Sequence, residues 1–381
     1  MTRGTRPTLS LAAAVLLLAQ CGTWRPVSID AGESVVVVAA TSSREHAQGA
    51  VSVAARRSGE FRSAHDLLTI HYESAVVTSG SRVYVVEGHG ADSLVLVDGP
   101  ALGPENLAYR QSLGTPADAR DIAVAGRDKA YVSRRARSSL AVVECATGAV
   151  VDEISLAGAP YVHGPDTVPF MGDVLISEGS LYVALQRLVT EQGRFGGYPG
   201  VKDSSGMIAV VSISTDKVTR TIRLRKKRPV TMDTCGGFLY VACGGSPFDA
   251  TDGGIEKISL STGENTGVVI TEKQLGGDVS LIITTGAKTA YVAVEKTSST
   301  FQRYSDLIQC DLDAGSVGAS VPGFSGSLGG LAFDGEYLYV GDRSENAPGI
   351  VVIEPRSNTK VAGPISVGRF PPVSIAVMRT E

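Results

Sequence analysis

The chain has 381 residues, of which 43% are apolar and 19% are charged, and its formal net charge is -4. The apolar content is too high for a disordered chain, and 44 glycines are typical of a protein rich in strands and turns. The acidic balance lacks the basic footprint of a nucleic-acid-binding protein, so we expect no nucleic-acid partner. We interpret the one basic run, residues 223–228, as a solvated edge at the end of a strand.

The N-terminus has the pattern of an export signal. Arg3 and Arg6 precede an apolar run from Leu9 to Leu18. A basic start followed by about ten apolar residues is typical of a secretory signal, and it is too short to span a bilayer as a mature helix. We therefore predict a cleaved signal peptide at 1–20.

The end of this signal, Leu-Ala-Gln-Cys at 18–21, resembles a bacterial lipoprotein signal, in which the cysteine carries the lipid. The resemblance implies an exported cell-envelope protein that is attached to a lipid bilayer through Cys21, with residues 21–30 as a tether. Gly22 follows the cysteine in place of Asp, which favours the outer membrane of a Gram-negative-type bacterium. An ordinary secretory signal, with Cys21 in place by chance, is the alternative.

Beyond the tether, a Tyr-Val pair recurs with a spacing of 47 to 58 residues. Self-similarity at such a period is the mark of a repeat architecture. The repeated tyrosines are Tyr84, Tyr131, Tyr182, Tyr240, Tyr291 and Tyr339. Each pair leads out of a turn into an apolar stretch, so we predict that it lies in the second strand of a repeat and serves packing.

One repeat shows a pattern of four strands clearly. Short apolar runs at 121–125, 130–133, 139–144 and 149–156 are separated by turn residues such as Gly148. Runs of four to eight residues bounded by turn signals are typical of an antiparallel meander. We therefore predict that each repeat is a four-stranded blade.

The two ends of the chain together supply a seventh repeat. Residues 34–39, 49–55 and 61–70 give three strands without a first strand, and residues 372–378 copy a first strand with no repeat after it. Joining them closes a ring and leaves no open sheet edge. We predict an all-β fold over residues 31–381: a seven-bladed β-propeller of four-stranded antiparallel blades, closed by the C-terminal strand joining the N-terminal blade.

Four segments of the repeats carry a family resemblance. Tyr131-Val-Ser-Arg, Val142-Val-Glu-Cys and Thr147-Gly-Ala-Val-Val occur in this order, and Val367-Gly-Arg-Phe-Pro precedes the last strand. The pattern resembles the repeats of the YVTN or YncE-like β-propeller family, and the resemblance covers about residues 31–379. It implies the propeller fold and says little about function, because propellers host enzymes, receptors and scaffolds alike.

One face of such a propeller carries the loops between second and third strands and the crossings between blades. We call it the long-loop face, because the longest insertions lie there, the largest at 186–205. Loops on a rigid scaffold are where function usually resides. The candidate ligand-binding residues are His89, Arg134, Asp121, His163, Asp173, Arg187, Phe195, Tyr198, Phe301, Tyr304, Asp342 and Arg343. For the charged residues plain solvation is the alternative, and for the aromatic ones it is packing within the loops.

Two of these residues, Asp121 and Asp173, fall where first strands begin at the channel mouth. Propeller lactonases hold a metal at such a place, so a channel-mouth divalent cation is one interpretation, and capping of the strand ends is the other. We expect no other cofactor and no catalytic residue. The predicted function is a cell-envelope lipoprotein whose propeller is a binding or scaffolding module for an unknown protein, glycan or small molecule. The alternative is a metal-assisted, lactonase-like hydrolase or lyase.

Overall fold

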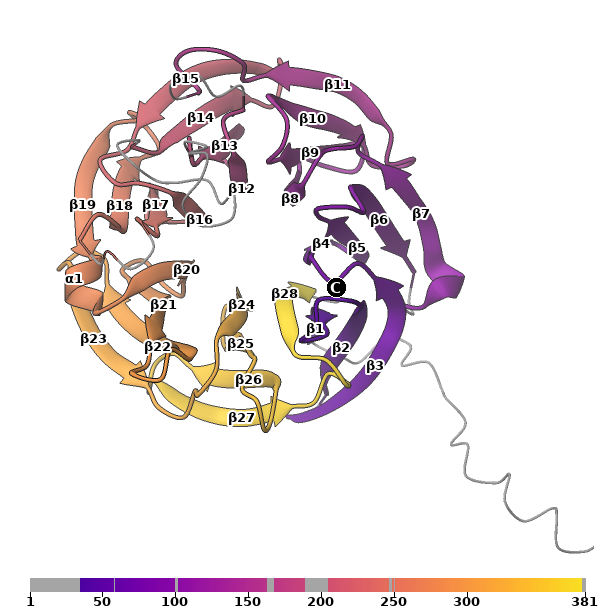
Figure 1. Ribbon diagram of the computed structural model, residues 1–381, viewed down its shortest axis with the longest axis vertical. Helices are drawn as coiled ribbons and strands as arrows, with labels where there is room; N and C mark the ends of the chain where they lie inside the picture. The colour runs from indigo at the N-terminus through magenta and orange to yellow at the C-terminus, as the bar shows by residue number, and fades with distance from the viewer. Residues whose placement is uncertain are drawn as a thin grey trace, which may run out of the picture.

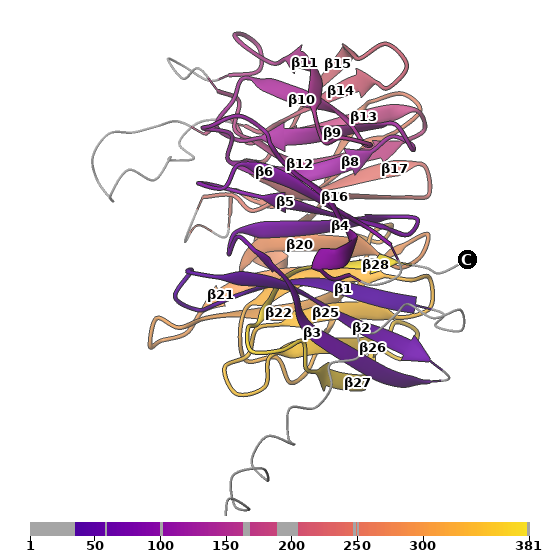
Figure 2. The same ribbon diagram turned by 90° about the vertical axis from the view of Figure 1, so that its right-hand side faces the viewer.

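The computed structural model describes residues 35–57, 59–99, 102–162, 168–188, 205–246, 249 and 251–378. These residues form seven four-stranded antiparallel sheets, which stand as blades around a central axis (Figure 1). Figure 2 shows the same ring edge-on, with the strands running across its thickness. The predicted all-β, seven-bladed propeller is confirmed.

Each blade has its first strand next to the axis and its last strand at the rim (Figure 1). From axis to rim, blade 1 consists of β28 (Pro372–Met378), β1 (Val35–Ser42), β2 (Gly49–Arg57) and β3 (Glu60–Ile70). Blade 2 consists of β4 (Ser74–Ser79), β5 (Arg82–Glu87), β6 (Ser93–Asp98) and β7 (Leu107–Ser112). Blade 3 consists of β8 (Ala119–Val124), β9 (Lys129–Arg134), β10 (Ser139–Glu144) and β11 (Val150–Ser155).

The other four blades repeat this arrangement. Blade 4 consists of β12 (Met171–Ser177), β13 (Ser180–Leu185), β14 (Met207–Ser212) and β15 (Lys217–Arg223). Blade 5 consists of β16 (Pro229–Cys235), β17 (Phe238–Cys243), β18 (Gly254–Ser259) and β19 (Asn265–Thr271). Blade 6 consists of β20 (Asp278–Thr284), β21 (Thr289–Thr297), β22 (Arg303–Asp311) and β23 (Ser316–Val321). Blade 7 consists of β24 (Leu328–Phe333), β25 (Leu338–Asp342), β26 (Gly349–Glu354) and β27 (Thr359–Ile365).

The ring is closed by the two ends of the chain, as predicted. The C-terminal strand β28 pairs antiparallel with β1, and its register joins Val36 to Met378 and Ala40 to Ser374. Blade 1 therefore holds its innermost strand from the end of the sequence and its other three from the beginning. This pairing covers the inner edge of β1 and closes the ring.

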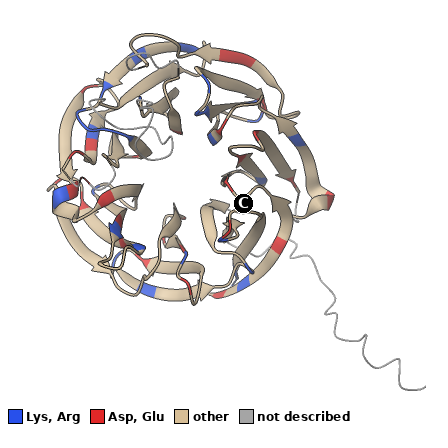
Figure 3. Cartoon of the chain, viewed as in Figure 1, with Lys and Arg blue, Asp and Glu red and all other residues tan. Residues whose placement is uncertain are grey.

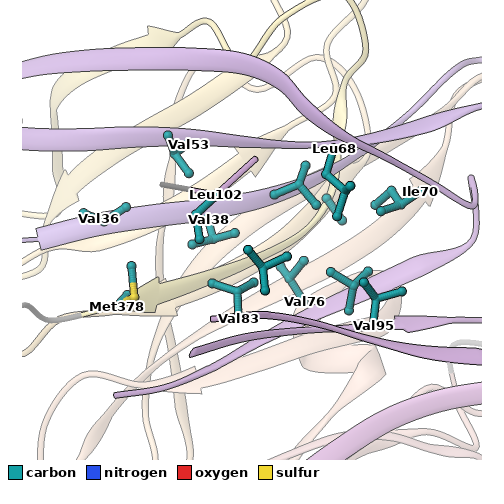
Figure 4. Close-up of a cluster of buried hydrophobic side chains, with 14 of the residues drawn as sticks. Val36, Val38, Val53, Leu68, Ile70, Val76, Val83, Val95, Leu102 and Met378 are labelled. Atoms are coloured by element: carbon teal, nitrogen blue, oxygen red, sulfur yellow. The ribbon is translucent and has the colours of Figure 1, made fainter. Parts of the chain in front are cut away.

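The core lies between neighbouring blades, so strands in the middle of a blade, such as β1, β5 and β9, are buried on both faces. In β1, Val36 and Val38 pack against blade 2, while Val35 and Val37 pack against blade 7. Side chains of a strand alternate between its two faces, which is why a strand between two blades requires consecutive apolar residues. Figure 4 shows the cluster between blades 1 and 2, where Val76 faces the valines of β1.

The Tyr-Val pairs lie in the second strands and serve packing, as predicted. Their six tyrosine side chains are at most 5% exposed. The hydroxyl group of Tyr339, for example, donates a hydrogen bond to the carboxylate of Asp334 at 2.8 Å. A buried tyrosine with a bonded hydroxyl is a packing residue, so the repeated phrase marks the scaffold and not the site.

Helical structure is scarce in the described part of the chain. A 3₁₀ turn at Pro104–Asn106 precedes β7, and the short helix α1 (Glu272–Leu275) lies in the crossing from blade 5 to blade 6. The side chain of Thr271 caps α1 by accepting the backbone N–H of Gln274. None of the helices in these residues is long and apolar enough to cross a bilayer.

Candidate functional site

A central cavity of about 1290 Å³ opens between the inner strands, on the long-loop face. Its wall combines the beginnings of first strands with residues of the loops and crossings on that face. The inner strands contribute Asp121, Asp173 and Thr231, and the loops contribute Arg135 and Arg228. Figure 3 shows residues of both charges around this axis. Charged and apolar side chains thus line the cavity together, and residues far apart in the sequence build it.

The first-strand residues at the cavity tie each blade to the next. A carboxylate oxygen of Asp121 accepts the backbone N–H of Val174 at 3.0 Å, and Thr231 Oγ1 accepts that of Ile282 at 3.1 Å. Bonds of this kind satisfy backbone groups that a strand next to the axis cannot pair on its open side. These side chains thus have a structural role. Capping of the strand ends was one of the two interpretations that the sequence left open.

Asp121 and Asp173 form a carboxyl pair in the wall of the cavity. Burial raises the pKa of Asp173 well above its usual range, and the neighbouring charge of Asp121 raises it further. Burial also raises the pKa of Asp121, while the hydrogen bond from Asp173 lowers it. The hydrogen bond of the pair runs from Asp173 to Asp121, and the pair keeps a proton to higher pH than separate aspartates do, because two adjacent carboxylates ionise together only at a cost in such surroundings.

Four arginines line the same cavity. We call three of them the arginine cluster: Arg120, Arg135 and Arg228. The fourth, Arg303, begins β22. Arg120 pairs with Glu73 at 2.7 Å and with Asp118 at 2.8 Å. Arg228 donates a hydrogen bond to the carbonyl oxygen of Gly244 at 2.7 Å. Burial lowers the pKa of Arg135, and the charges of Arg120 and Arg228 lower it further. These guanidinium groups therefore lie close enough to repel one another.

The basic run at 223–228 does not form a solvated edge throughout. Lys227 and Arg228 line the central cavity, and Lys227 pairs with Asp252 at 3.0 Å. The interpretation was wrong for these two residues because the crossing from blade 4 to blade 5 turns them toward the axis. The sequence shows that this run is charged, but it does not predict the direction in which the side chains point.

Arg134 and Asp342 lie away from the cavity and are bonded within their own blades. Arg134 is 3% exposed and pairs with Glu153 at 2.5 Å. Asp342 is 2% exposed and accepts the backbone N–H of Ser344 at 2.9 Å. Both side chains are used by the scaffold, so we remove them from the candidate site.

The other described candidates are not brought together. Arg187 is buried and donates to the carbonyl oxygen of Ser205 at 2.9 Å. His89 is exposed in the loop after β5, and Phe301, 89% exposed, lies at the turn before β22 with Tyr304 half-buried beside it. Arg343 lines a smaller neighbouring cavity of about 490 Å³. Cys21, His163, Phe195 and Tyr198 lie outside the described residues.

Among the described residues, no group of three or more His, Cys, Asp or Glu side chains has an arrangement that could hold a metal ion. Asp121 and Asp173 are two carboxyl groups with one proton between them, and each already accepts a backbone N–H. Such a pair is a poor donor set for a divalent cation, which prefers several ionised oxygen ligands. The donor groups of this cavity thus do not fit the metal of the lactonase-like alternative.

Comparison of the sequence with protein-family models and with curated proteins finds no match. The fold is similar to solved structures. The putative 6-phosphogluconolactonase of Bacteroides uniformis has a TM-score of 0.63 and 13% identity, over 91% of this chain and 100% of that one. The corresponding protein of Bacteroides fragilis gives 0.61 and 16%, over 91% and 98%. AztD of Citrobacter koseri, without ligand, gives 0.54 and 13%, over 91% and 98%. At such identities the likeness shows the fold alone: this chain is a seven-bladed β-propeller.

Proposed function

We propose that this protein is an exported, lipid-anchored binding protein of the cell envelope, and that its propeller takes a small polar ligand into the central cavity. The observation that carries the proposal is the cavity itself. Its volume of about 1290 Å³ suits a small molecule, and charged side chains of several blades converge on it. A rigid ring with polar groups directed inward is well suited to binding, because its groups are held in place before the ligand arrives.

A matched pair of tryptophan variants tests whether the ligand enters the cavity. Ala75 lines the cavity on β4, so Ala75→Trp places a large side chain in it without removing a side-chain hydrogen bond. Val151, 61% exposed on the outer strand β11, provides the control Val151→Trp. We expect a metabolite screen by thermal shift to find a ligand for the parent and for Val151→Trp, and loss of its effect in Ala75→Trp. Equal shifts in both variants would contradict the proposed place of binding.

The lipid anchor is tested at Cys21, which the signal-like sequence before it singles out. We expect Cys21→Ser to move the protein from the membrane fraction to the soluble exported fraction, because the residue that accepts the lipid is lost. Detergent partitioning and cell fractionation measure this directly. A variant that stays with the membrane would contradict the anchor and leave the ordinary secretory signal. The outer membrane is tested by density separation of the two membranes.

A second candidate, a hydrolase of lactones, is favoured by the carboxyl pair. A protonated Asp173 beside an ionised Asp121 offers an acid and a base in one wall of the cavity. Two structural neighbours described as lactonases have the same fold, at low identity. Lactone opening by the parent, lost in Asp173→Asn, would support this candidate, while an inactive parent would remove it. Activity that disappears on chelation would reinstate a metal.

A further inference from the structure

We infer that the ligand of the central cavity carries an oxyanion group, a phosphate or a carboxylate, and that the arginine cluster (Arg120, Arg135 and Arg228) binds it. The inference rests on the proposed function, since it names the chemical class of the same ligand. Three observations support it: the three guanidinium groups line one cavity, their hydrogen bonding within the protein is incomplete, and they repel one another.

The three arginines approach the cavity from different segments. Arg120 lies on β8, Arg135 lies in the loop between β9 and β10, and Arg228 directly precedes β16. All three side chains line one cavity, although more than ninety residues separate Arg135 from Arg228 in the sequence. Planar guanidinium groups that converge from several sides match the separate oxygen atoms of a phosphate or carboxylate.

The cluster is incompletely bonded within the protein. The Nε atoms of Arg120 and Arg228 are buried and have no hydrogen-bond partner among the described residues. Arg135 donates no side-chain hydrogen bond to any of these residues, and its nearest recorded carboxylate contact is Asp118, at 3.9 Å. Buried donors without acceptors are unfavourable, so an acceptor from outside the protein would stabilise Arg120 and Arg228, and the partly exposed Arg135 is free to bind the same acceptor.

The charges around the cluster also favour an anion. Three guanidinium groups contact two carboxylates, those of Glu73 and Asp118, which both lie on the Arg120 side. No ion pair joins the cluster to Asp121 or Asp173 within the described residues. The positive charges of Arg120 and Arg228 lower the pKa of Arg135, so their mutual repulsion is present in the empty protein. A bound oxyanion relieves that repulsion.

A purely structural cluster would behave differently. Arg134, the neighbour of Arg135, is bonded to Glu153 and to the carbonyl oxygen of Leu113, as a scaffold arginine is. Among the described residues, the guanidinium group of Arg135 makes only the long contact with Asp118 at 3.9 Å, and it lies 5.9 Å from the ring of Phe170. If the cluster serves binding, replacing Arg135 lowers anion affinity and leaves the stability of the empty protein equal or higher.

Isothermal titration of the full mature protein tests the inference, with inorganic phosphate and acetate as probes at constant ionic strength set by chloride. We expect at least one probe to bind the parent, and Arg135→Gln to weaken it by about ten- to a hundredfold, since a charged hydrogen-bond partner is lost. The control Arg62→Gln removes an exposed arginine of the outer strand β3 and should bind like the parent. Phosphate binding alone assigns a phosphate-bearing ligand, and acetate binding alone a carboxylate-bearing one.

Two results would overturn the inference: no binding of either probe at tens of millimolar, or equal binding by the parent and Arg135→Gln. If Arg135→Gln does not fold, Arg228→Gln carries the same test, with the same expected loss. The proposed function fails separately. If the parent binds a neutral ligand, Ala75→Trp abolishes that binding and no anion binds, then the oxyanion inference fails and the proposed function stands. If the metabolite screen finds no ligand and no anion binds, both the oxyanion inference and the proposed binding function fail.

Discussion

The carboxyl group of Asp173 accepts the backbone N–H of Met232 at 2.6 Å, and so joins the first strand of blade 4 to that of blade 5. The same side chain donates a hydrogen bond to Asp121 of blade 3. One residue therefore links three consecutive blades at the wall of the cavity. The protonation of Asp173 therefore affects the stability of the ring as well as any chemistry at the site.

The proton shared by Asp121 and Asp173 predicts a dependence of stability on pH. Their pKa values are raised in the folded protein, so the pair contributes stability that is fully present below about pH 4 and is lost as the pH rises. In Asp173→Asn the amide still accepts from Met232 and donates to Asp121 without holding a titratable proton. We expect its melting temperature at pH 8 to exceed that of the parent by roughly 2–4 °C, and no difference at pH 4.

Asp173→Ala serves as the control, because it removes the acceptor of the Met232 N–H as well. We expect it to be less stable than the parent at both pH values, by about 1–3 kcal/mol in the free energy of unfolding. If Asp173→Asn and Asp173→Ala behaved alike in thermal melts, the shared proton would be the wrong account of this pair.

The adjacent arginines of blade 3 predict opposite effects. Arg134 is buried and bonded, so Arg134→Gln should destabilise the fold by about 2–4 kcal/mol and leave anion binding in the surviving folded protein unchanged. Arg135→Gln should weaken anion binding and leave the stability of the empty protein equal or higher. Chemical denaturation and titration calorimetry on the two variants measure both quantities. A loss of stability in Arg135→Gln as large as in Arg134→Gln would assign Arg135 to the scaffold.

How far the sequence predicts this structure is clear from the same pair of arginines. The turn signals and the Tyr-Val spacing predicted seven blades and the closure by residues 372–378, because strand periodicity and burial are local properties. They also placed Asp121 and Asp173 at the channel. The sequence did not predict the arginine cluster, since only the curvature of the ring brings Arg135 and Arg228 to the same cavity. Sequence alone did not separate the buried Arg134 from its neighbour in the cavity.

A buried carboxyl group on the first residue of α1 predicts a second pH effect. Burial raises the pKa of Glu272 to about 7, and its Oε1 accepts the backbone N–H of Val279 at 2.9 Å. Because the folded pKa is above the unfolded value, the stability from this group is fully present below about pH 4.5 and is lost as the pH rises to about 7. Glu272→Gln should remove this part of the pH dependence, which thermal melts from pH 4 to 8 would show. An unchanged slope would contradict it.

The close packing of blades 7 and 1 predicts a site where one methyl group is not tolerated. A Cβ atom on Gly329 would lie 2.0 Å from the carbonyl oxygen of Pro372, so Gly329→Ala forces β24 and β28 apart. We expect a loss of about 1–3 kcal/mol in the free energy of unfolding. Gly286→Ala is the control, because its Cβ meets no atom within 4 Å, and it should change stability by less than about 0.5 kcal/mol. Equal effects in denaturant titrations would refute this packing.

The pairing of β28 with β1 also sets the order in which the molecule is completed. Translation releases β1 first and its innermost partner last, so the inner edge of β1 has no native partner until almost the whole chain has left the ribosome. No truncated product that stops before β28 can form the finished ring. Under the export proposed above, this delay would keep the polypeptide unfolded, and so able to cross a membrane, until its synthesis is nearly over.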